Sequence, residues 1–356
     1  MDENDRKPLS EEDLALVHAL QLHPRASWTG LAPVLGAAPV TLARRWERLR
    51  AAGYAWVTSY PVVRDGRMQV ALVEVDCAPG RLDAVSRALD REPSAMTIEH
   101  VARGRDLLLT VNARSFQELS ALVLDRLGRV PGVASTRTHL AAGVHVEGSR
   151  WELDALEPAQ AEAVRALRRT DEQTGDTART VDLHGPVYGP IVRLLGADGR
   201  AGAAAIAAAL DRPASTVRRR LADLLRSGQL VFRCEVAQLL TRWPVCVTWW
   251  IRMPTAAVPG AVRRIRRDPR VRLCLSLTGP ANVLVTAWTQ SLPELVAMQA
   301  VLERELPEAE IVDTSVVLRT RKRMGWLLHP DGRCTGTSVP LAPAAYPISM
   351  TGDDLG

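Results

Sequence analysis

Two stretches of the chain, residues 31–53 and 206–228, combine a helical spacing of apolar residues with a run of arginines. In each, three apolar residues recur at intervals of about one helical turn, which places them on one face of a helix. The pattern predicts helices with an apolar inner face and an arginine-lined outer face. The inner positions are Leu42, Trp46 and Leu49 in the first stretch and Val217, Leu221 and Leu224 in the second.

These two stretches are similar to each other, because they align without gaps from Leu31 on Ile206 to Gly53 on Gly228. Gly104 also recurs as Gly279, and Pro131 recurs as Pro307, the offset having slipped by one position. The sequence therefore predicts a duplication of whole modules. The identical positions in the aligned stretches are Ala32, Leu35, Thr41, Arg44, Arg45, Leu49 and Gly53, which recur as Ala207, Leu210, Thr216, Arg219, Arg220, Leu224 and Gly228.

Each arginine-lined helix is predicted to be the last of three short helices. Pro39 and Pro213 stand at its entrance, where a missing N–H is tolerated, and Gly53 and Gly228 end it. Three such helices are typical of a helix-turn-helix, whose last helix enters the major groove of DNA. A solvated cationic face is the simpler alternative, but its recurrence at the same place favours DNA binding.

The candidate DNA contacts lie on these two helices, with Arg45 and Arg220 expected to be the principal ones. The full set is Pro39, Val40, Thr41, Arg44, Arg45, Arg48, Ser215, Thr216, Arg219 and Arg220.

A second pattern follows each set of helices, beginning with β-branched and aromatic residues at 54–63 and 230–239. The order strand, helix, strand, strand, helix, strand then predicts a ferredoxin-like βαββαβ sheet with helices on one face. We expect the bare faces of the two sheets to cover each other. The predicted elements are 68–76, 81–91, 95–102, 107–112, 115–127 and 133–145, and then 245–253, 257–268, 271–278, 283–288, 292–305 and 310–318.

The chain is thus predicted to be α+β, with two copies of a winged helix-turn-helix plus an effector domain paired as an intrachain pseudo-dimer. Between the copies, 151–169 is expected to be a helix and 170–180 a polar linker. The expected domains are helix-turn-helix domains at 1–60 and 184–236, ferredoxin-like effector domains at 61–147 and 237–324, a helix and linker at 148–183, and a mobile tail at 325–356.

Composition adds little to this picture, because 45 basic and 40 acidic residues leave a net charge of only +5. The five cysteines form no CxxC pair, and the histidines show no HxH or HExxH spacing, so we expect no metal and no cofactor. The acidic N-terminus and the lack of about 18 consecutive apolar residues favour a cytoplasmic protein without a membrane partner.

Two smaller features leave alternatives open. The basic segment 319–323 is expected either to touch phosphates or to be a solvated strand end. A cluster of tryptophans in the second effector domain favours core packing over a ligand pocket. These tryptophans are Trp243, Trp249, Trp250 and Trp288.

The order of parts, together with two motifs, resembles the Lrp/AsnC family of feast/famine regulators. The run Pro39 to Leu42 with Arg45 and Leu49 is similar to the family's recognition helix, and 127–138 (LGRVPGVASTRT) is similar to its "LPGV…T" turn. The resemblance covers about 9–146 and 186–324, here termed the first and second modules. It implies promoter binding tuned by small effectors such as amino acids, and assembly into homo-oligomers through the effector domains.

The chain departs from the family's pattern at two places. Ala38 and Arg212-Pro213 stand where the family has a capping Ser, a loss of about 1 kcal/mol. The Gly-rich effector turn appears as 104–106 (GRD) and 279–282 (GPAN), so the two effector sites are expected to differ. The effector-binding candidates that the resemblance implies are Gly104, Asp106, Thr136, Thr138, Gly279, Asn282 and Thr314.

Three functions remain in competition. The leading one is a non-enzymatic, sequence-specific DNA-binding transcriptional regulator. Some proteins that resemble this family are sirohaem decarboxylases, but the retained arginine faces and the lack of a His-rich cluster argue against a catalytic site. The third is a ligand-sensing scaffold that does not bind DNA.

Overall fold

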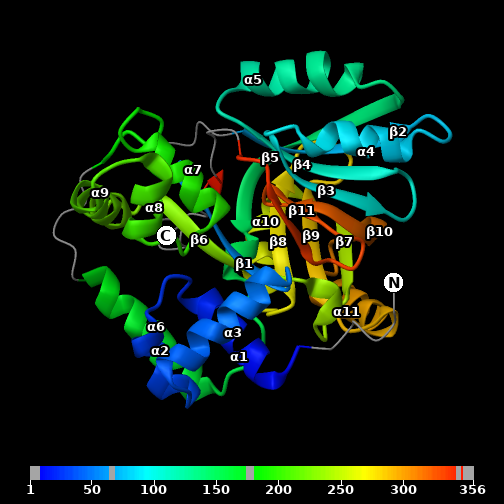
Figure 1. Cartoon of the computed structure of the whole chain (residues 1–356). Helices are drawn as coiled ribbons and strands as arrows, with labels where there is room; N and C mark the ends of the chain where they lie inside the picture. Colours follow the sequence, from blue (N-terminus) through cyan, green and yellow to red (C-terminus); the bar gives the residue numbers. More distant parts are fainter. Residues whose placement is uncertain (1–8, 64–68, 174–179, 342–345, 348–356) are drawn as a thin grey trace. The chain divides into compact units, whose positions relative to one another are not determined.

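The computed structural model describes residues 9–63, 69–173, 180–341 and 346–347 (Figure 1). They fall into two compact units. The helical unit combines Met1–Val62, Glu152–Thr241 and Arg333–Pro340, and the barrel unit combines Val63–Trp151, Arg242–Gly332 and Leu341–Gly356. Both arginine-lined stretches therefore lie in the first unit, and both predicted effector domains, apart from their first few residues, lie in the second. The α+β class predicted from the sequence is confirmed.

The helical unit contains two sets of three helices, each followed by a strand. Apolar residues spaced by a helical turn form the core of each set, including Leu16, Leu31 and Leu49 in the first and Ile191 and Leu224 in the second. The elements are α1 (Glu11–Leu22), α2 (Trp28–Leu35), α3 (Pro39–Ala51), β1 (Ala55–Val63), α6 (Pro158–Gln173), α7 (Gly189–Ala197), α8 (Ala203–Leu210), α9 (Ala214–Arg226), β6 (Leu230–Val236), the 3-10 turn Gln238–Leu240 and β12 (Cys334–Ser338).

The two helical sets are joined by an antiparallel ladder between β1 and β6. Its register runs from Ala55 opposite Val236 to Pro61 opposite Leu230, with Thr58 opposite Arg233 at the centre. Thr58 and Arg233 are also equivalent positions when the alignment of the arginine stretches is continued along the chain. Each residue pair of the ladder therefore has an equivalent pair in which the two modules have changed places.

Two arginines at equivalent positions of the two modules repeat this reciprocity. Arg25 donates to the backbone oxygens of Gly199 and, at 3.2 Å, Ala201. Arg200 donates to Pro24 O at 2.6 Å and Ala26 O at 2.8 Å. Burial lowers the pKa of both guanidinium groups, that of Arg200 to about 10. Each module thus holds the other by equivalent buried hydrogen bonds.

The helix predicted at 151–169 is shifted, since α6 begins at Pro158 and runs to Gln173. The segment before it is held on the first module, where His18 Nδ1 accepts the N–H groups of Ala155 and Leu156. Those bonds keep the backbone extended before the helix begins. The predicted linker at 170–180 is therefore helical in its first part, and 174–179 lie outside the described residues.

The barrel unit has the predicted βαββαβ order in both modules. Its elements are β2 (Gln69–Cys77), α4 (Leu82–Asp90), β3 (Ala95–Val101), β4 (Leu107–Ala113), α5 (Phe116–Ser120) continued by helical turns at Ala121–Arg126 and Leu127–Arg129, β5 (Val133–Val146), the turn Gly148–Arg150, β7 (Val245–Arg252), the turn Thr255–Ala257, α10 (Val258–Ile265), β8 (Val271–Leu277), β9 (Val283–Thr289), α11 (Leu292–Glu305), β10 (Glu310–Arg323), β11 (Trp326–Leu328) and β13 (Tyr346–Pro347).

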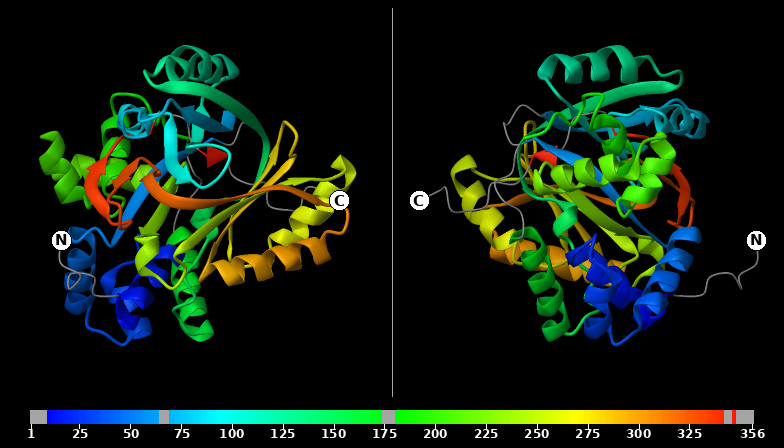
Figure 2. Two further views of the ribbon diagram at one scale, coloured as in Figure 1. Left: turned by 90° about the vertical axis from the view of Figure 1, so that its right-hand side faces the viewer. Right: turned by 60° about the vertical axis from the view of Figure 1, so that its left-hand side comes forward.

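The predicted pair of facing sheets is instead one closed barrel. Within the described residues, eight strands follow the order β10-β3-β4-β2-β5-β8-β9-β7, and β10 pairs with β7 to close the ring. Closure follows from the length of β5 and β10, which have 14 residues each. Each continues beyond its own sheet and pairs with the other module, β5 with β8 and β10 with β3, so no edge is left unpaired. Figure 2 shows the long β10 crossing the unit.

Among the described residues of the barrel unit, apolar side chains form clusters, of which three show how its parts are joined. One joins the first module's sheet to α4 and α5, and another joins the second module's sheet to α10 and α11. The third, which includes Leu72, Leu108, Trp250 and Leu284, draws on both modules. Trp249, Trp250 and Trp288 are buried, which agrees with core packing, whereas Trp243 is only partly buried.

The prediction of a structureless tail is wrong for residues 325–340. β11 pairs with the end of β10, with Trp326 opposite Arg323. In the helical unit, the Cys334 N–H donates to Gly53 O at 2.8 Å. Both segments are stabilised by pairing with distant parts of the chain, which local sequence periodicity does not reveal. Residues 342–345 and 348–356 lie outside the described residues.

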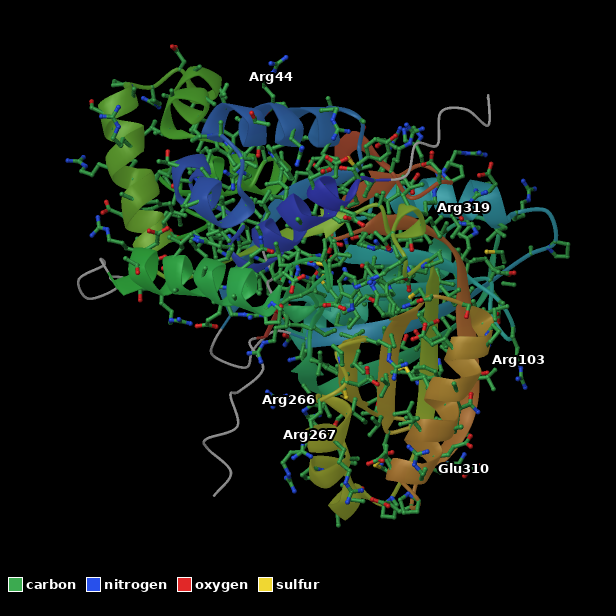
Figure 3. The ribbon with its side chains drawn as sticks, turned by 90° about the horizontal axis from the view of Figure 1, so that it is seen from below. Arg44, Arg103, Arg266, Arg267, Glu310 and Arg319 are labelled. Atoms are coloured by element: carbon green, nitrogen blue, oxygen red, sulfur yellow. The ribbon has the colours of Figure 1, made fainter. Side chains whose placement is uncertain are left out.

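The basic segment 319–323 serves mainly to hold the barrel unit together. Arg321 forms a bidentate pair with Asp90 at 2.7 and 2.5 Å. Lys322 is fully buried, and its Nζ donates to the backbone oxygens of Asp90 and Glu92 at 3.0 and 2.8 Å. Of this segment, Arg319 is exposed (Figure 3).

Lys322 should make stability depend on pH. Burial lowers the pKa of its ammonium group from 10.5 to about 8. Between these values the unfolded chain binds more protons, so the Lys322 contribution to the free energy of unfolding rises with pH, by up to about 1.4 kcal/mol per pH unit. Urea unfolding of the wild type and Lys322→Met at about pH 7 and about pH 9.5 measures this. The wild type should gain stability relative to the variant at the higher pH. An equal difference in the free energy of unfolding at both pH values would contradict the lowered pKa of Lys322.

Candidate nucleic-acid interface

The arginine-lined helices α3 and α9 begin without a side-chain cap. Ala38 and Pro213 occupy the N-cap positions, and neither forms a side-chain hydrogen bond to the helix. Both helices are followed by a glycine with positive φ, Gly53 at 72° and Gly228 at 62°. A Cβ at Gly53 would lie 2.3 Å from the backbone oxygen of Cys334, so this position requires glycine. Tertiary packing rather than capping therefore fixes both helices.

Arg44 is the outward-pointing arginine of α3. Leu42, Trp46 and Leu49 are buried on the inner face, and Arg44 lies on the opposite side of the helix. Figure 3 shows its side chain directed away from the ribbon. Pro39, Val40 and Thr41, in the first turn, are also exposed, Val40 by 66%. This face offers a small apolar and polar surface beside a guanidinium group.

Arg219 occupies the equivalent position of α9. It is exposed, like Arg218 and Ser215, whereas Thr216 and Arg220 are partly buried. Within the described part of the chain, none of the three consecutive arginines 218–220 forms a side-chain hydrogen bond or ion pair. Their charges are therefore available to an anionic partner.

Arg45 and Arg48 of α3 differ, because both are paired with Asp13. The Asp13 side chain is only 6% exposed, contacts Arg48, and lies 3.7 Å from Arg45 Nε. It also accepts the Ser10 N–H at the start of α1. The equivalent position of the second module is Tyr188, so α9 has no matching carboxylate. The two helices thus differ in their ion pairs, and they also differ in sequence, since Asp223 of α9, which pairs with Arg226, is the counterpart of Arg48.

The predicted effector residues are largely occupied within the barrel unit. Asp106 Oδ2 accepts the Cys77 N–H at 2.7 Å. Asn282 Oδ1 accepts the Met253 N–H at 3.1 Å, and its Nδ2 donates to Met253 O at 2.8 Å. Thr314 donates to Gln299 at 3.3 Å. These polar atoms hold strands and helices in place.

The remaining effector candidates lie on turns and strands. Gly104 and Gly279 have positive φ values of 77° and 114° in their turns. Thr136 and Thr138 lie on β5, opposite Val75 and Val73 of β2.

Sequence reasoning missed a charged network that begins in the same turn. Arg105 is 6% exposed, contacts Asp313, lies 3.4 Å from Glu74, and stacks 4.9 Å from the centre of the Trp250 ring. His139 also bonds Glu74 at 2.8 Å. Burial raises the pKa of Glu74, but His139, Arg105 and Arg137 more than offset this and hold it below its usual value. The network joins the two modules, and only the position of Arg105 in the Gly-rich turn hinted at it.

Other classes of site find no support in the described residues. No group of three or more His, Cys, Asp or Glu side chains is placed to hold a metal ion there. The described helices include none that is long and apolar enough to span a bilayer. The five cysteines are all free thiols, and burial raises the pKa of each.

This chain is similar to known proteins over parts of its length. Residues 70–151 match the family model of the Lrp/AsnC ligand binding domain. An uncharacterized HTH-type transcriptional regulator of Pyrococcus furiosus is 27% identical over 139 residues, which is 38% of this chain and 93% of that protein. The HTH-type transcriptional regulator FL11 of Pyrococcus horikoshii is 25% identical over 146 residues, covering 40% of this chain and 95% of its own.

A solved structure is similar over a longer stretch. The siroheme decarboxylase NirDL covers 87% of this chain and 92% of its own, with 13% identity and a TM-score of 0.48. At these values the likeness carries no functional argument.

Removing the Asn282 side chain should destabilise the barrel unit. Asn282→Ala loses both bonds to Met253 and leaves buried backbone groups unpaired, so the free energy of unfolding should fall by about 1–3 kcal/mol. Thr136→Ala, at a partly buried effector candidate on β5, should change it by less than about 0.5 kcal/mol. Urea denaturation followed by circular dichroism measures both, and equal stability of Asn282→Ala and wild type would show that this side chain does not hold the turn.

Proposed function

We propose that this chain, a relative of HTH-type transcriptional regulators that carries an Lrp/AsnC ligand binding domain, is a sequence-specific DNA-binding regulator of transcription. The observation that carries the proposal is the pair α3 and α9. Both helices expose an arginine-bearing face, lie in one compact unit, and are held there by reciprocal contacts. Guanidinium groups on the outer face of a helix suit bidentate contact with guanine and phosphate.

We further infer that one polypeptide supplies both halves of a dimer-like assembly. The ladder between β5 and β8 pairs Ala141 with Leu277, and the ladder between β10 and β3 pairs Val317 with Val101. These two pairs occupy equivalent positions when the modules are aligned with Pro131 on Pro307. In both ladders the strand pairing shifts directly after these pairs. With the β1–β6 ladder, the pairing of both units supports a two-fold relation between the modules.

The principal DNA contacts are proposed to be Arg44 and Arg219 rather than Arg45 and Arg220. The latter two lie at the flank of their helices and are partly buried. Arg44 and Arg219 point directly outward and are equivalent positions of the aligned stretches. The N-terminal turns of the same helices, with Ser215 in α9, are proposed to accompany them over base edges.

The operator is proposed to be asymmetric. On α3, Asp13 neutralises part of the charge of Arg45 and Arg48, whereas on α9 three consecutive arginines keep their full charge. Phosphate contacts dominate the affinity of such interfaces, so α9 should bind its half-site more strongly than α3. A small effector is proposed to tune binding through the barrel unit, as the Lrp/AsnC ligand binding domain suggests.

Replacing the outward arginines should weaken DNA binding. Fragments selected from genomic DNA by the purified chain serve as probes in fluorescence anisotropy. Arg44→Ala and Arg219→Ala should each cost about 1–3 kcal/mol of binding free energy if they contact bases, with the larger loss at Arg219.

Arg129→Ala is the matched control, because Arg129 is 75% exposed in the barrel unit and pairs with Asp125. It should leave affinity within twofold of wild type. Unchanged affinity in both Arg44→Ala and Arg219→Ala would contradict the proposed interface.

Releasing Arg45 and Arg48 from Asp13 should strengthen binding. Asp13→Asn keeps an acceptor for the Ser10 N–H but removes the negative charge, so affinity should rise several-fold and the slope of log affinity against log salt should steepen by about 1. Glu11→Gln makes the same charge change in the first turn of α1. Anisotropy titrations over a salt series test this, and an equal gain in both variants would show that net charge alone is responsible.

A further inference from the structure

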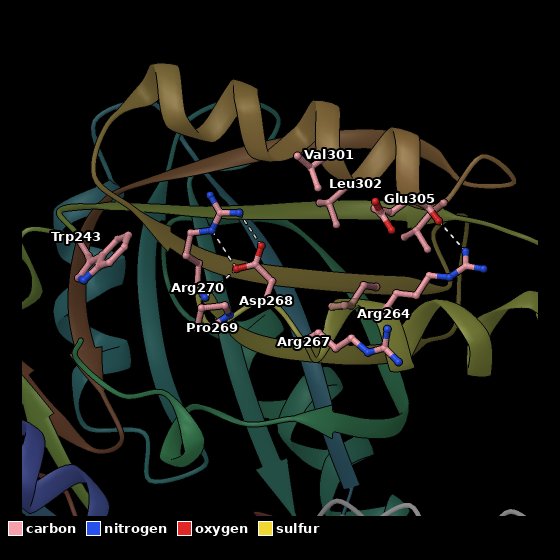
Figure 4. Close-up of a pocket in the computed structure, with 11 residues that line it drawn as sticks. Trp243, Arg264, Arg267, Asp268, Pro269, Arg270, Val301, Leu302 and Glu305 are labelled. Atoms are coloured by element: carbon pink, nitrogen blue, oxygen red, sulfur yellow. Dashed lines mark hydrogen bonds and ion pairs between the residues drawn. The ribbon is translucent and has the colours of Figure 1, made fainter. Parts of the chain in front are cut away.

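The second module contains a cavity that the proposed function does not use. It lies in the barrel unit between α10, α11 and the loop at 266–270, and has a volume of 560 Å³ (Figure 4). Its apolar lining includes Pro269, Leu302 and Leu306, and Trp243 stands at one end. A volume of about 300–1000 Å³ is typical of small-molecule sites.

The charged residues at the other end of the cavity leave an excess of positive charge. Arg264 uses one nitrogen to donate to the backbone oxygen of Glu305 at 2.6 Å and is otherwise exposed. Arg267 is exposed and forms no side-chain hydrogen bond or ion pair within the described segments. The Glu305 carboxylate, 54% exposed, lies 3.9 Å from Arg304. Two guanidinium groups therefore border the apolar space with free donors.

The third arginine of the cavity is already neutralised. Arg270 donates to both Asp268 carboxylate oxygens, at 2.9 and 2.6 Å, and to Glu294 at 3.1 Å. The hydrogen bonds to Asp268 raise the pKa of this guanidinium further. Arg270 thus fixes the loop at 266–270 and does not add to the charge that a ligand would meet.

The first module carries a charged side chain at the matching position of its helix. In the register that aligns Pro131 with Pro307, Arg126 stands in place of Leu302. Its guanidinium reaches down from the helix to Glu92 at 3.0 Å and to Ser94 at 3.4 Å. In the second module the guanidinium comes instead from Arg270 in the loop, the counterpart of Ser94. The guanidinium group thus comes from the helix in the first module and from the loop in the second. Leu302, which replaces it on α11, lines the cavity.

We infer that this cavity binds an amphipathic monocarboxylate. Its apolar chain or ring would lie against Pro269, Leu302 and Leu306, and its carboxylate would meet Arg264 and Arg267. Guanidinium groups bind carboxylates through short, charge-assisted hydrogen bonds, and the apolar lining adds area removed from water. The inference requires nothing of the recognition helices, so it stands or fails independently of DNA binding.

Calorimetric titration of the full chain with octanoate, in the absence of DNA, tests the site. The wild type should bind one octanoate per chain, and octylammonium, with the same alkyl chain and the opposite charge, should bind at least tenfold more weakly. Leu302→Arg places the first module's residue in the cavity and should weaken octanoate binding at least tenfold. Arg267→Gln, at an exposed side chain that folding does not require, should weaken it about five- to tenfold.

Arg91→Gln is the matched control, because Arg91 is the counterpart of Arg267 in the first module. It should leave octanoate binding unchanged. Three outcomes would overturn the inference: no binding of octanoate at millimolar concentration, equal affinity for octylammonium, or unchanged affinity in a Leu302→Arg variant whose circular dichroism matches the wild type.

Discussion

The antiparallel ladder between β1 and β6 is the constraint on which the rest of the structure depends. It brings together two helix sets that are far apart in the sequence, and Arg25 and Arg200 reinforce it with reciprocal bonds to buried backbone oxygens. Both guanidinium groups thereby bond backbone carbonyls of buried or partly buried residues. Because the ladder and the arginines connect the modules equivalently in both directions, the orientation of α3 relative to α9 is fixed within the helical unit.

The two modules pair through equivalent positions but carry different residues at several of them. The central pair of the ladder is Thr58 with Arg233, and two identical modules would place either two threonines or two arginines there. Asp13 and Tyr188 provide a second difference, since two arginines of α3 pair with a carboxylate that the second module lacks at the equivalent position. Arg126 and Leu302 provide a third, since a charged side chain in one module stands where an apolar residue lines a cavity in the other. Each difference gives the single chain an asymmetry that two identical subunits cannot have.

Local patterns predicted the elements but not their long-range partners. The spacing of Leu42, Trp46 and Leu49 was sufficient to locate α3, since the residues of one helix face are close together in the sequence. Barrel closure was not predictable, because it depends on which strands of the other module pair with the long ends of β5 and β10. The pairing of Arg45 with Asp13 and the strand at 326–328 likewise depend on contacts between segments that are distant in sequence. The predicted effector residues were chosen by family resemblance, which does not show that Asn282 is already bonded to Met253.

The most direct test of the central claim, that two recognition helices of one chain read DNA, is a hydroxyl-radical footprint on a selected genomic fragment. The account predicts two separate protected stretches with unequal protection, of which the stronger is lost in Arg219→Ala and the weaker in Arg44→Ala. A single protected stretch, or protection without a fixed position on the fragment, would contradict it.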